Sequence, residues 1–311
     1  MCSLVFCFYV NFLFFKGEQD ADKLELRGWY DMFRERNPDI SKRSGKATAK
    51  ERFEAVSEDT IKETLFKLKA LIDKHGFEPH KIANFDQSAC YPDMPVRKTL
   101  AKKGAKTINI RTTGNRSHYT LNALITAQGQ CIPPTFIIDA SNKKLQEMKA
   151  SAPVGSQFIS GKDSTYVNGS KMNLILDHFK KYFSPPALLL VDGHGAHCDT
   201  EFILRCQEYG YVVFRFPGHL THILQPLDST PFASLKNEYQ QLHKAWVKDN
   251  PLKRMSINES VKLMSTAWNK AMCPANIIAG FTSTGCFPIS VEKAMARAEP
   301  STPAITSNKN E

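Results

Sequence analysis

Three aspartates of this chain stand where apolar strands would deliver them to one rim of a sheet. Asp86 follows the buried-looking run Ile82–Phe85, and Asp192 ends the very apolar run Leu188–Val191. Asp228 lies just ahead of a predicted helix, so it can point back at the sheet edge. Ligands and catalytic groups of α/β sheets gather at such strand ends. The pattern predicts that the three carboxylates converge.

Clustered carboxylates favour hard divalent cations. Mg²⁺ (or Mn²⁺) takes oxygen ligands, and two such ions about 3.5–4 Å apart can activate a water and stabilise the leaving oxygen of a phosphodiester. Each aspartate taken singly has a plainer interpretation, as a cap, a turn residue or a residue of a helix's first turn. Because all three occur in similar settings, that alternative weakens when they are considered together.

The elements that must position these acids are short strands alternating with helices. Hydrophobic periodicity and turn residues define them. The predicted strands are Ile82–Phe85, Thr107–Thr112, His118–Thr126, Ile132–Ile138, Ala187–Val191 and Tyr211–Phe216. The predicted helices are Lys171–Tyr182, Thr200–Tyr209 and Phe232–Lys248. The fold class is therefore α/β, a mixed sheet flanked by helices on both faces.

A small helical segment is expected before this sheet. Residues 18–75 are polar and helical in pattern, with a basic linker at Ser41–Arg52. Residues 57–75 read as one amphipathic helix, with Ser57 as its N-cap. Asn142–Asn168 is less regular, and the polar tail after Val291 has no periodic pattern, so we expect it to be mobile.

The charge balance favours a polyanionic partner. Lys and Arg outnumber Asp and Glu by 41 to 31, which gives a net charge of +10. The segment 97–116 has no acid, and its position beside the first aspartate favours contacts to DNA phosphates over the alternative of a solvated face. Its cations are Arg97, Lys98, Lys102, Lys103, Lys106, Arg111 and Arg116.

Cysteine usage and the first residues bear on the compartment. The 8 cysteines form no C-x-x-C pair, so reduced intracellular thiols are expected. The apolar opening, about 15 residues long, is shorter than the roughly 20 that a membrane-spanning helix needs, and it lacks the basic start of a secretory signal. We expect no membrane association, and we interpret residues 1–17 as an anomalous segment, foreign to the rest of the gene.

Several histidines lie close to the acids in sequence. His194, His197, Cys198, His219 and His222 include two H-x-x-H pairs. A structural zinc site wants four soft or imidazole ligands in a closed tetrahedron, and these residues are also accounted for as turns that bracket the acids. We expect His194, His222 and Gln87 to support the site, by hydrogen bonds to the ligands or contacts to DNA, with simple packing as the alternative.

Three blocks of sequence resemble a known family. Asn84–Gln87, Leu189–His197 and Phe216–Asp228 closely resemble the DDE domain of pogo/Tigger/jerky-like transposases, and the run Leu224–Asp228 (LQPLD) is the most specific. Gly28–Arg36 resembles the end of a centromere-protein-B-type helix-turn-helix domain. The resemblance extends over roughly residues 27–250.

This resemblance implies a ribonuclease-H-like fold and a nuclear protein whose partner is DNA. It implies Mg²⁺-dependent hydrolysis at transposon ends, followed by attack of the freed 3′ hydroxyl on target DNA, with Asp86, Asp192 and Asp228 as metal ligands. Relatives often have Glu directly after the first Asp, where this chain has Gln87. Most of the helix-turn-helix region is missing, which predicts poor sequence selectivity.

The domain organisation follows from these patterns. We expect an N-terminal segment (1–17), a helix-turn-helix remnant with a basic linker (18–56), a DDE endonuclease domain (57–250), a C-terminal helical extension (251–291) and a polar tail (292–311). Two alternatives to an active endonuclease stay open: a non-catalytic DNA-binding protein of the nucleus derived from a transposase, and an inert transposon remnant. Homo-oligomerisation also stays open.

Overall fold

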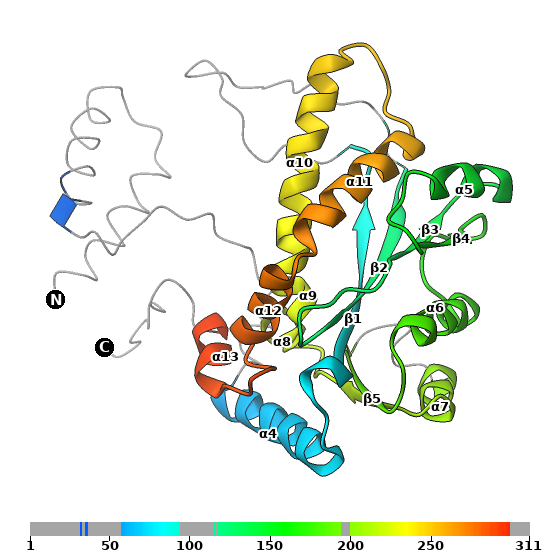
Figure 1. Cartoon of the computed structure of the whole chain (residues 1–311). Helices are drawn as coiled ribbons and strands as arrows, with labels where there is room; N and C mark the ends of the chain where they lie inside the picture. The colour runs from blue at the N-terminus through cyan, green and yellow to red at the C-terminus, as the bar shows by residue number, and fades with distance from the viewer. Residues whose placement is uncertain are drawn as a thin grey trace, which may run out of the picture. The chain divides into compact units, whose positions relative to one another are not determined.

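The structure is a computed structural model, and it describes residues 57–93, 115, 117–193 and 200–298 together with Met32, Glu35 and Arg36. Residues 54–299 form one compact unit. That unit contains the sheet and the helices that surround it (Figure 1). The expected small helical segment within residues 18–56, apart from the three residues just named, and the predicted strand Thr107–Thr112 lie outside the described residues.

Within the described residues, six strands form one mixed sheet in the order β4-β3-β2-β1-β5-β6. The strands are β1 (Ile82–Cys90), β2 (Tyr119–Thr126), β3 (Thr135–Ile138), β4 (Gln157–Ser160), β5 (Ala187–Val191) and β6 (Tyr211–Arg215). β2 is antiparallel to both of its neighbours, and the other pairings are parallel. The carboxyl ends of five strands and the start of β2 therefore share one edge, which we call the carboxyl edge.

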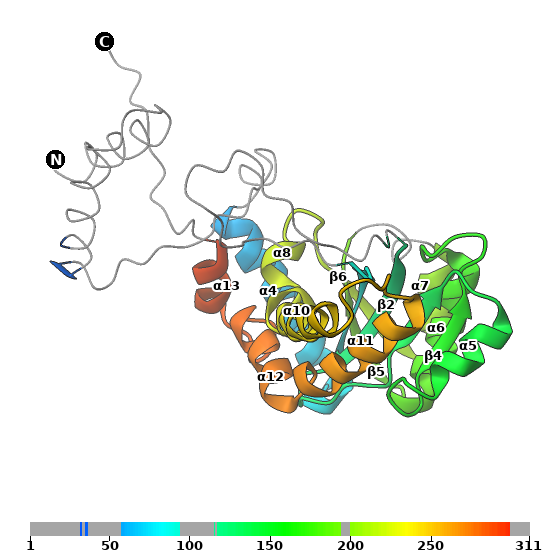
Figure 2. The same ribbon diagram turned by 90° about the horizontal axis from the view of Figure 1, so that it is seen from above.

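The helices cover both faces of this sheet. In chain order they are α4 (Glu58–His75), the 3-10 turn η1 (Pro79–Lys81), α5 (Asn142–Lys149), α6 (Gly169–Tyr182), α7 (Thr200–Glu208), α8 (Thr221–Leu224), α9 (Pro226–Ser229), α10 (Pro231–Asp249), α11 (Ile257–Ala271), α12 (Pro274–Ser283) and α13 (Val291–Ala298). In Figures 1 and 2 the sheet separates α10 and α11 from α6 and α7. No described helix is both long and apolar enough to cross a bilayer.

Alternation along the strands produces two cores, one on each face. Ile82 of β1 and Leu188 and Leu190 of β5 belong to the core shared with α4 and α8–α13, which we call the α10-side core. Phe85 of β1 and Leu189 of β5 belong to the core shared with α6 and α7, the α6-side core. Successive side chains of a strand point to opposite faces, so one strand serves both cores. A sheet buried on both faces explains the nearly continuous apolar runs in the sequence.

Local sequence signals set several helix ends. The Ser57 side chain accepts a hydrogen bond from the Thr60 N–H at the start of α4, as predicted. That helix ends at Gly76, whose φ of 64° is left-handed and suits a residue without a side chain. Ser256 and Glu259 form a reciprocal capping box at the start of α11. These ends follow from sequence patterns of a few residues.

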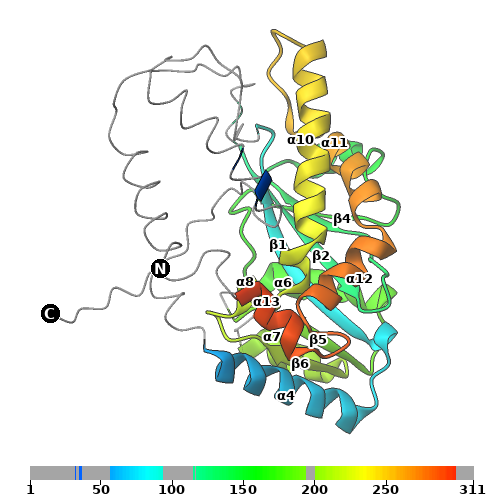
Figure 3. The ribbon, with the colours of Figure 1, turned by 90° about the vertical axis from the view of Figure 1, so that its left-hand side faces the viewer.

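The predicted α/β fold is confirmed, and most predicted elements agree within a few residues. The predicted strand Ile132–Ile138 is shortened to β3, since Pro133 and Pro134 have no N–H to donate. Two expectations were wrong. The less regular segment 142–168 contains α5 and the edge strand β4. The tail expected to be mobile begins with α13, which packs against α4 and α8 (Figure 3).

Candidate active site

Asp86 lies inside a strand, not after one. β1 continues to Cys90, so the expectation that Asp86 follows the strand end was wrong. The reason is pairing with β2, which continues from Ala83↔Thr126 to Cys90↔Tyr119 and carries the strand past the polar residues. Asp86 is only 8% exposed. A carboxyl group is therefore held on rigid, buried backbone.

Strand register brings Asp86 level with Asp192. The parallel ladder pairs Ile82 with Leu188 and Asn84 with Leu190. The same offset continued by two residues aligns Asp86 with Asp192, directly after β5. Neighbouring strands lie about 4.8 Å apart, so this offset, continued beyond the end of β5, would place the two residues one strand spacing apart. Asp86 also shares the parity of Ile82 and therefore points to the α10 side of the sheet.

Asp228 approaches from that same side. It lies on the short helix α9, which packs on β1. The buried side chain of Asn84 ties the three elements together: its amide donates to the Leu190 carbonyl at 2.9 Å, and its oxygen accepts from the Leu227 N–H at 2.9 Å. One side chain of β1 thus fixes both β5 and the turn that carries Asp228.

The pKa of the Asp86 carboxyl reflects the nearness of the other two acids. Burial raises the pKa of its carboxyl well above the usual range, and the nearby carboxylates of Asp228 and, more weakly, Asp192 raise it further. The Gln87 N–H, which donates to Asp86 at 2.7 Å, acts in the opposite direction. Asp192 is half-buried and Asp228 is exposed, so the cluster opens to solvent.

Gln225 is a further polar group beside Asp86, and the sequence interpretation missed it. Its side chain is fully buried and lowers the pKa of Asp86. Neither of its amide atoms, however, meets the geometry of a normal hydrogen bond to any described residue. We therefore describe it as a close polar neighbour of Asp86, not as a bonded one. The run LQPLD contains both Gln225 and Asp228, so the signal was present in the sequence.

The residue after Asp192 must be small. A Cβ atom at Gly193 would lie 2.5 Å from the Phe216 carbonyl oxygen and 3.1 Å from the Gly218 nitrogen. Both neighbours are backbone, so they could yield only by moving the segment between β6 and α8. The Asp192-Gly193 pair thus allows this close approach to the segment that leads into α8 and α9.

Arg297 of α13 holds the Asp228 segment from outside the sheet. Its guanidinium donates to the carbonyls of His222 at 3.1 Å and Ile223 at 2.9 Å, and to the Ser229 hydroxyl at 2.9 Å. Burial lowers the pKa of Arg297, and nearby Asp228 acts in the opposite direction. Arg297 was missed because the segment was interpreted as a polar tail. The spacing of Val291, Ala294, Met295 and Ala298, which is typical of an amphipathic helix, is the signal that could have found it.

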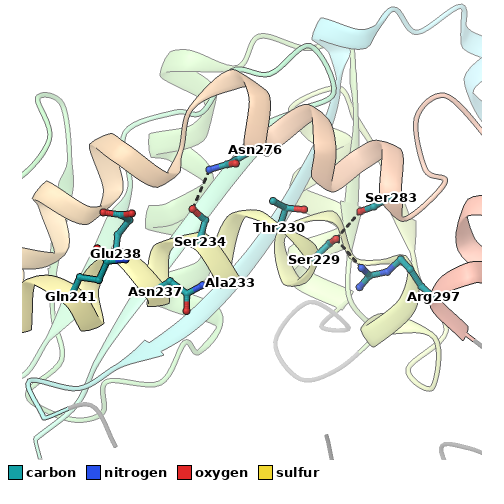
Figure 4. A pocket seen from close by; sticks show the side chains of 10 residues that line it. All are labelled: Ser229, Thr230, Ala233, Ser234, Asn237, Glu238, Gln241, Asn276, Ser283 and Arg297. Atoms are coloured by element: carbon teal, nitrogen blue, oxygen red, sulfur yellow. Dashed lines mark hydrogen bonds between the residues drawn. The ribbon is translucent and has the colours of Figure 1, made fainter. Parts of the chain in front are cut away.

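A polar groove of about 580 Å³ runs along α10 to this arginine (Figure 4). Hydroxyl and amide side chains of α9, α10 and α12 line most of it. Within it Ser229 lies between Arg297 and Ser283, which bonds to Ser229 at 2.7 Å. The groove is lined by Ser229 and Arg297, which hold the segment that carries Asp228, but Asp228 is not among its lining residues.

The remaining predicted residues divide into two groups. Gln87 is next to Asp86 and binds it through its backbone N–H, and His222 contributes its carbonyl to Arg297. His194 and all seven predicted DNA-binding cations lie outside the described residues. So do His197 and Cys198 of the zinc alternative. The roles assigned to all these residues stay predictions.

The donor set suits a divalent cation better than zinc. Three carboxylates supply the oxygen ligands that Mg²⁺ or Mn²⁺ takes. Asp228 and Asp192 raise the pKa of Asp86 because like charges repel, and a bound cation would relieve that repulsion. Within the described ranges, no three His, Cys, Asp or Glu side chains are grouped closely enough to hold a single ion.

Comparison with known proteins identifies a family and a similar fold. The sequence profile of the family described as DDE superfamily endonuclease matches residues 120–281, more than half of the chain. The match contains Asp192 and Asp228 and begins after Asp86. In fold, the chain is similar to the crystal structure of the Mos1 strand transfer complex, with a TM-score of 0.53 and 16% identity over 90% of this chain and 73% of that one.

A curated relative has a different name. The chain is 26% identical over 190 residues to a protein called MFS-type transporter clz9 from Cochliobolus lunatus. The match covers 60% of this chain and 20% of that protein. The chain thus spans about a fifth of the relative's length.

Proposed function

The chain belongs to the DDE superfamily endonucleases, and from that premise we propose that it is a divalent-metal-dependent DNA endonuclease of pogo/Tigger/jerky-like transposase descent, competent for strand transfer. The observation that carries the proposal is the convergence of Asp86, Asp192 and Asp228 at one side of the sheet. In this proposal the three aspartates are the catalytic, metal-binding residues.

The chemistry divides between the metal and the chain. Mg²⁺ (or Mn²⁺), when bound, supplies an activated water and stabilises the charge on the leaving oxygen. The residues of the chain hold the ligands in place: Asn84 joins β1, β5 and α9, and Arg297 fastens α8 to α9. Such supporting contacts matter because a small displacement of a ligand costs catalysis heavily.

DNA as the substrate follows from charge and descent. The net charge of +10 favours a polyanion, and the seven cations of residues 97–116 would contact phosphates whatever the base sequence. A nuclear location and a remnant of a centromere-protein-B-type helix-turn-helix domain at 18–56 belong to the same proposal. Because phosphate contacts carry no base sequence, we expect this chain to cleave with poor sequence selectivity.

The test is cleavage of pooled random duplexes by the full chain with Mg²⁺ or Mn²⁺. Wild-type protein is compared with Asp192→Ala and with Asp139→Ala. Asp139 is an exposed aspartate directly after β3, at the same carboxyl edge but not among the acids that shift Asp86. It therefore controls for any loss of negative charge at this edge.

We expect slow, scattered cleavage that Asp139→Ala retains and Asp192→Ala loses. Equal cleavage by all three proteins would show that the acids are not the nuclease. DNA binding without any metal-dependent cleavage would favour the alternative of a non-catalytic DNA-binding protein. A sharp sequence preference would contradict the expected loss of specific recognition.

A further inference from the structure

Three aromatic side chains meet at the carboxyl edge of the sheet. Tyr91 follows β1, His118 precedes β2, and Tyr166 lies between β4 and α6. The His118 ring centroid is 5.9 Å from that of Tyr91 and 5.4 Å from that of Tyr166. Tyr91 is 41% exposed and Tyr166 is 70% exposed. We call these three residues the aromatic platform.

Polar contacts beneath the rings hold the platform in place. The Thr165 hydroxyl bonds to the His118 Nε2 at 2.6 Å, and the Thr165 carbonyl accepts from the Thr120 hydroxyl at 2.7 Å. The Tyr166 N–H donates to the Ser164 hydroxyl at 3.0 Å. The loop before α6 is thereby fastened to β2, so the Tyr166 ring is exposed although its backbone is fixed. A fixed exposed ring loses little conformational entropy when it binds a ligand.

The strand directions place the platform on the same edge as the acids. Tyr91 follows Asp86 by five residues along β1, which corresponds to at most about 17 Å at 3.3 Å per residue. That length equals about five base steps at 3.4 Å per step of a DNA strand. A strand held at the acids can therefore reach the rings without leaving the edge of the sheet.

Two described residues that flank most of the basic segment, Asp93 and Asn115, lie close in sequence to the platform. Between them are residues 94–114, which lie outside the described residues. The Asn115 N–H donates to the Asp93 carboxylate at 2.8 Å. Asn115 is buried and its amide donates to the Met255 carbonyl at 2.9 Å. Asp93 and Asn115, which flank residues 94–114 in sequence, are therefore held to each other and to the chain before α11, within a few residues of Tyr91 and His118.

We propose that the aromatic platform is a stacking surface for an unpaired base of the DNA strand, a few nucleotides from the bond that is cut. The proposal rests on the proposed function, since it takes DNA as the ligand. Exposed rings bind unpaired bases because every base has a π face, whereas bases in a duplex are stacked on each other and are not available. The platform would therefore favour DNA with a single-stranded extension over a blunt duplex.

The test measures binding of the full chain to two DNA probes. One is a blunt duplex, and the other is the same duplex with a short single-stranded extension that carries the fluorescent base 2-aminopurine. Tyr166→Ala and Tyr91→Ala remove the rings, and Tyr166→Phe keeps the ring. Tyr182→Ala is the matched control, because Tyr182 is 48% exposed at the end of α6, before β5 begins and so away from the carboxyl edge.

We expect each platform alanine variant to weaken binding of the extended probe by roughly 5- to 150-fold, the range that alanine substitution of a base-stacking residue produces. Binding of the blunt duplex should change little, and Tyr166→Phe and Tyr182→Ala should behave like wild type. The 2-aminopurine fluorescence should be quenched by wild type and Tyr166→Phe, and not by Tyr166→Ala.

Three outcomes would overturn the proposal. Unchanged binding of the extended probe by both alanine variants would show that the rings are not used. Equal loss for the blunt and extended probes would point to a contact with the duplex instead of an unpaired base. Failure of wild type to bind either probe would overturn the proposed function as well, which separates the two failures. If an alanine variant melts early, Tyr166→Leu, with a similar apolar side chain, tests the same point.

Discussion

Asp86 and Asp177 are the same residue type in opposite circumstances. Asp86 is buried beside two further acids, and burial is the main cause that raises its pKa. Asp177 lies on α6, on the side that faces Arg205 of α7. Its slight burial acts to raise its pKa, but hydrogen bonds from Tyr209 and Arg205 outweigh that effect and lower it. Asp177 thus has its counter-charge within the chain, whereas Asp86 has further acids.

The contrast separates a structural carboxylate from one arranged for a ligand. In the surface ion pair Asp177–Arg205 each charge has its opposite charge within the chain, and such a pair contributes less than about 1 kcal/mol to stability. A buried carboxylate among other carboxylates costs stability unless a cation or a proton relieves it. Such a cost is accepted where function requires it, so Asp86 and not Asp177 belongs to the candidate active site.

Substituting the two aspartates should give the largest difference. We expect Asp86→Asn to reduce metal-dependent cleavage by more than the roughly 10- to 100-fold that loss of a supporting residue of a metal site causes, because it removes a proposed ligand. Its unfolding free energy in the absence of metal should not fall, since a buried acid has been made neutral. Asp177→Asn should retain cleavage. Cleavage rates and urea unfolding check both, and equal losses would erase the contrast.

Asn84 should be the next most sensitive position. Asn84→Ala leaves the Leu190 carbonyl and the Leu227 N–H without their partner, and each buried group left unpaired costs about 1–3 kcal/mol. Cleavage should fall as well, because β5 and α9 lose their common anchor. Asn173→Ala, which removes an exposed bond from α6 to Glu201, should cost little by comparison. Urea titration of the two variants measures the difference, and equal unfolding free energies would contradict it.

The arginines of the two regions give a third pair. Arg297→Met should raise the Mn²⁺ concentration needed for half-maximal cleavage by roughly 10- to 100-fold, because the Asp228 segment loses its support. Direct Mn²⁺ binding, followed by calorimetry, should weaken in parallel. Arg205→Met removes the partner of Asp177 and should leave the Mn²⁺ dependence unchanged. A mere packing role for Arg297 would lower thermal stability without altering the metal dependence.

The smallest effect should be the pH response of α6. Burial lowers the pKa of His178 below its usual 6.5, and Lys181 acts in the same direction, against a hydrogen bond to the Pro133 carbonyl. Folding therefore favours the neutral ring. Its contribution to stability is complete above about pH 6.5 and is lost as the pH falls toward the folded value. His178→Gln should flatten the decline in melting temperature between about pH 7 and pH 5. An unchanged decline would assign it to other groups.

Sequence patterns predicted the parts of the fold that depend on local signals. The apolar run at β5 and the Ser57 cap of α4 are decided by residues close in the chain. The continuation of β1 through Asp86 and the edge strand β4 are not, because each is set by pairing with a strand distant in sequence. A strand that is polar at its centre is recognised only when its partner is known.

The site followed the same division. The three acids could be predicted because each stands in a distinctive block of sequence, and LQPLD even contains Gln225. Asn84 belongs to one of the three distinctive blocks of sequence. Its bonds to Leu190 and Leu227, however, join residues more than a hundred positions apart and leave no local pattern. Arg297 is one of two cations in a short helix. Its function depends on which carbonyls lie opposite, and only the tertiary structure brings those together.

The bond between Asp93 and Asn115 has a consequence for how this protein can vary. The hydrogen bond joins the two residues that flank 94–114, and the register of β1 and β2 is already fixed by the pairing of Cys90 with Tyr119. In general, each doubling of the length of a flexible loop whose ends are held together costs only about 0.6 kcal/mol in closure entropy. The chain between Asp93 and Asn115 can therefore change in length or charge, through evolution or protein engineering, without rebuilding the part of the sheet that carries Asp86.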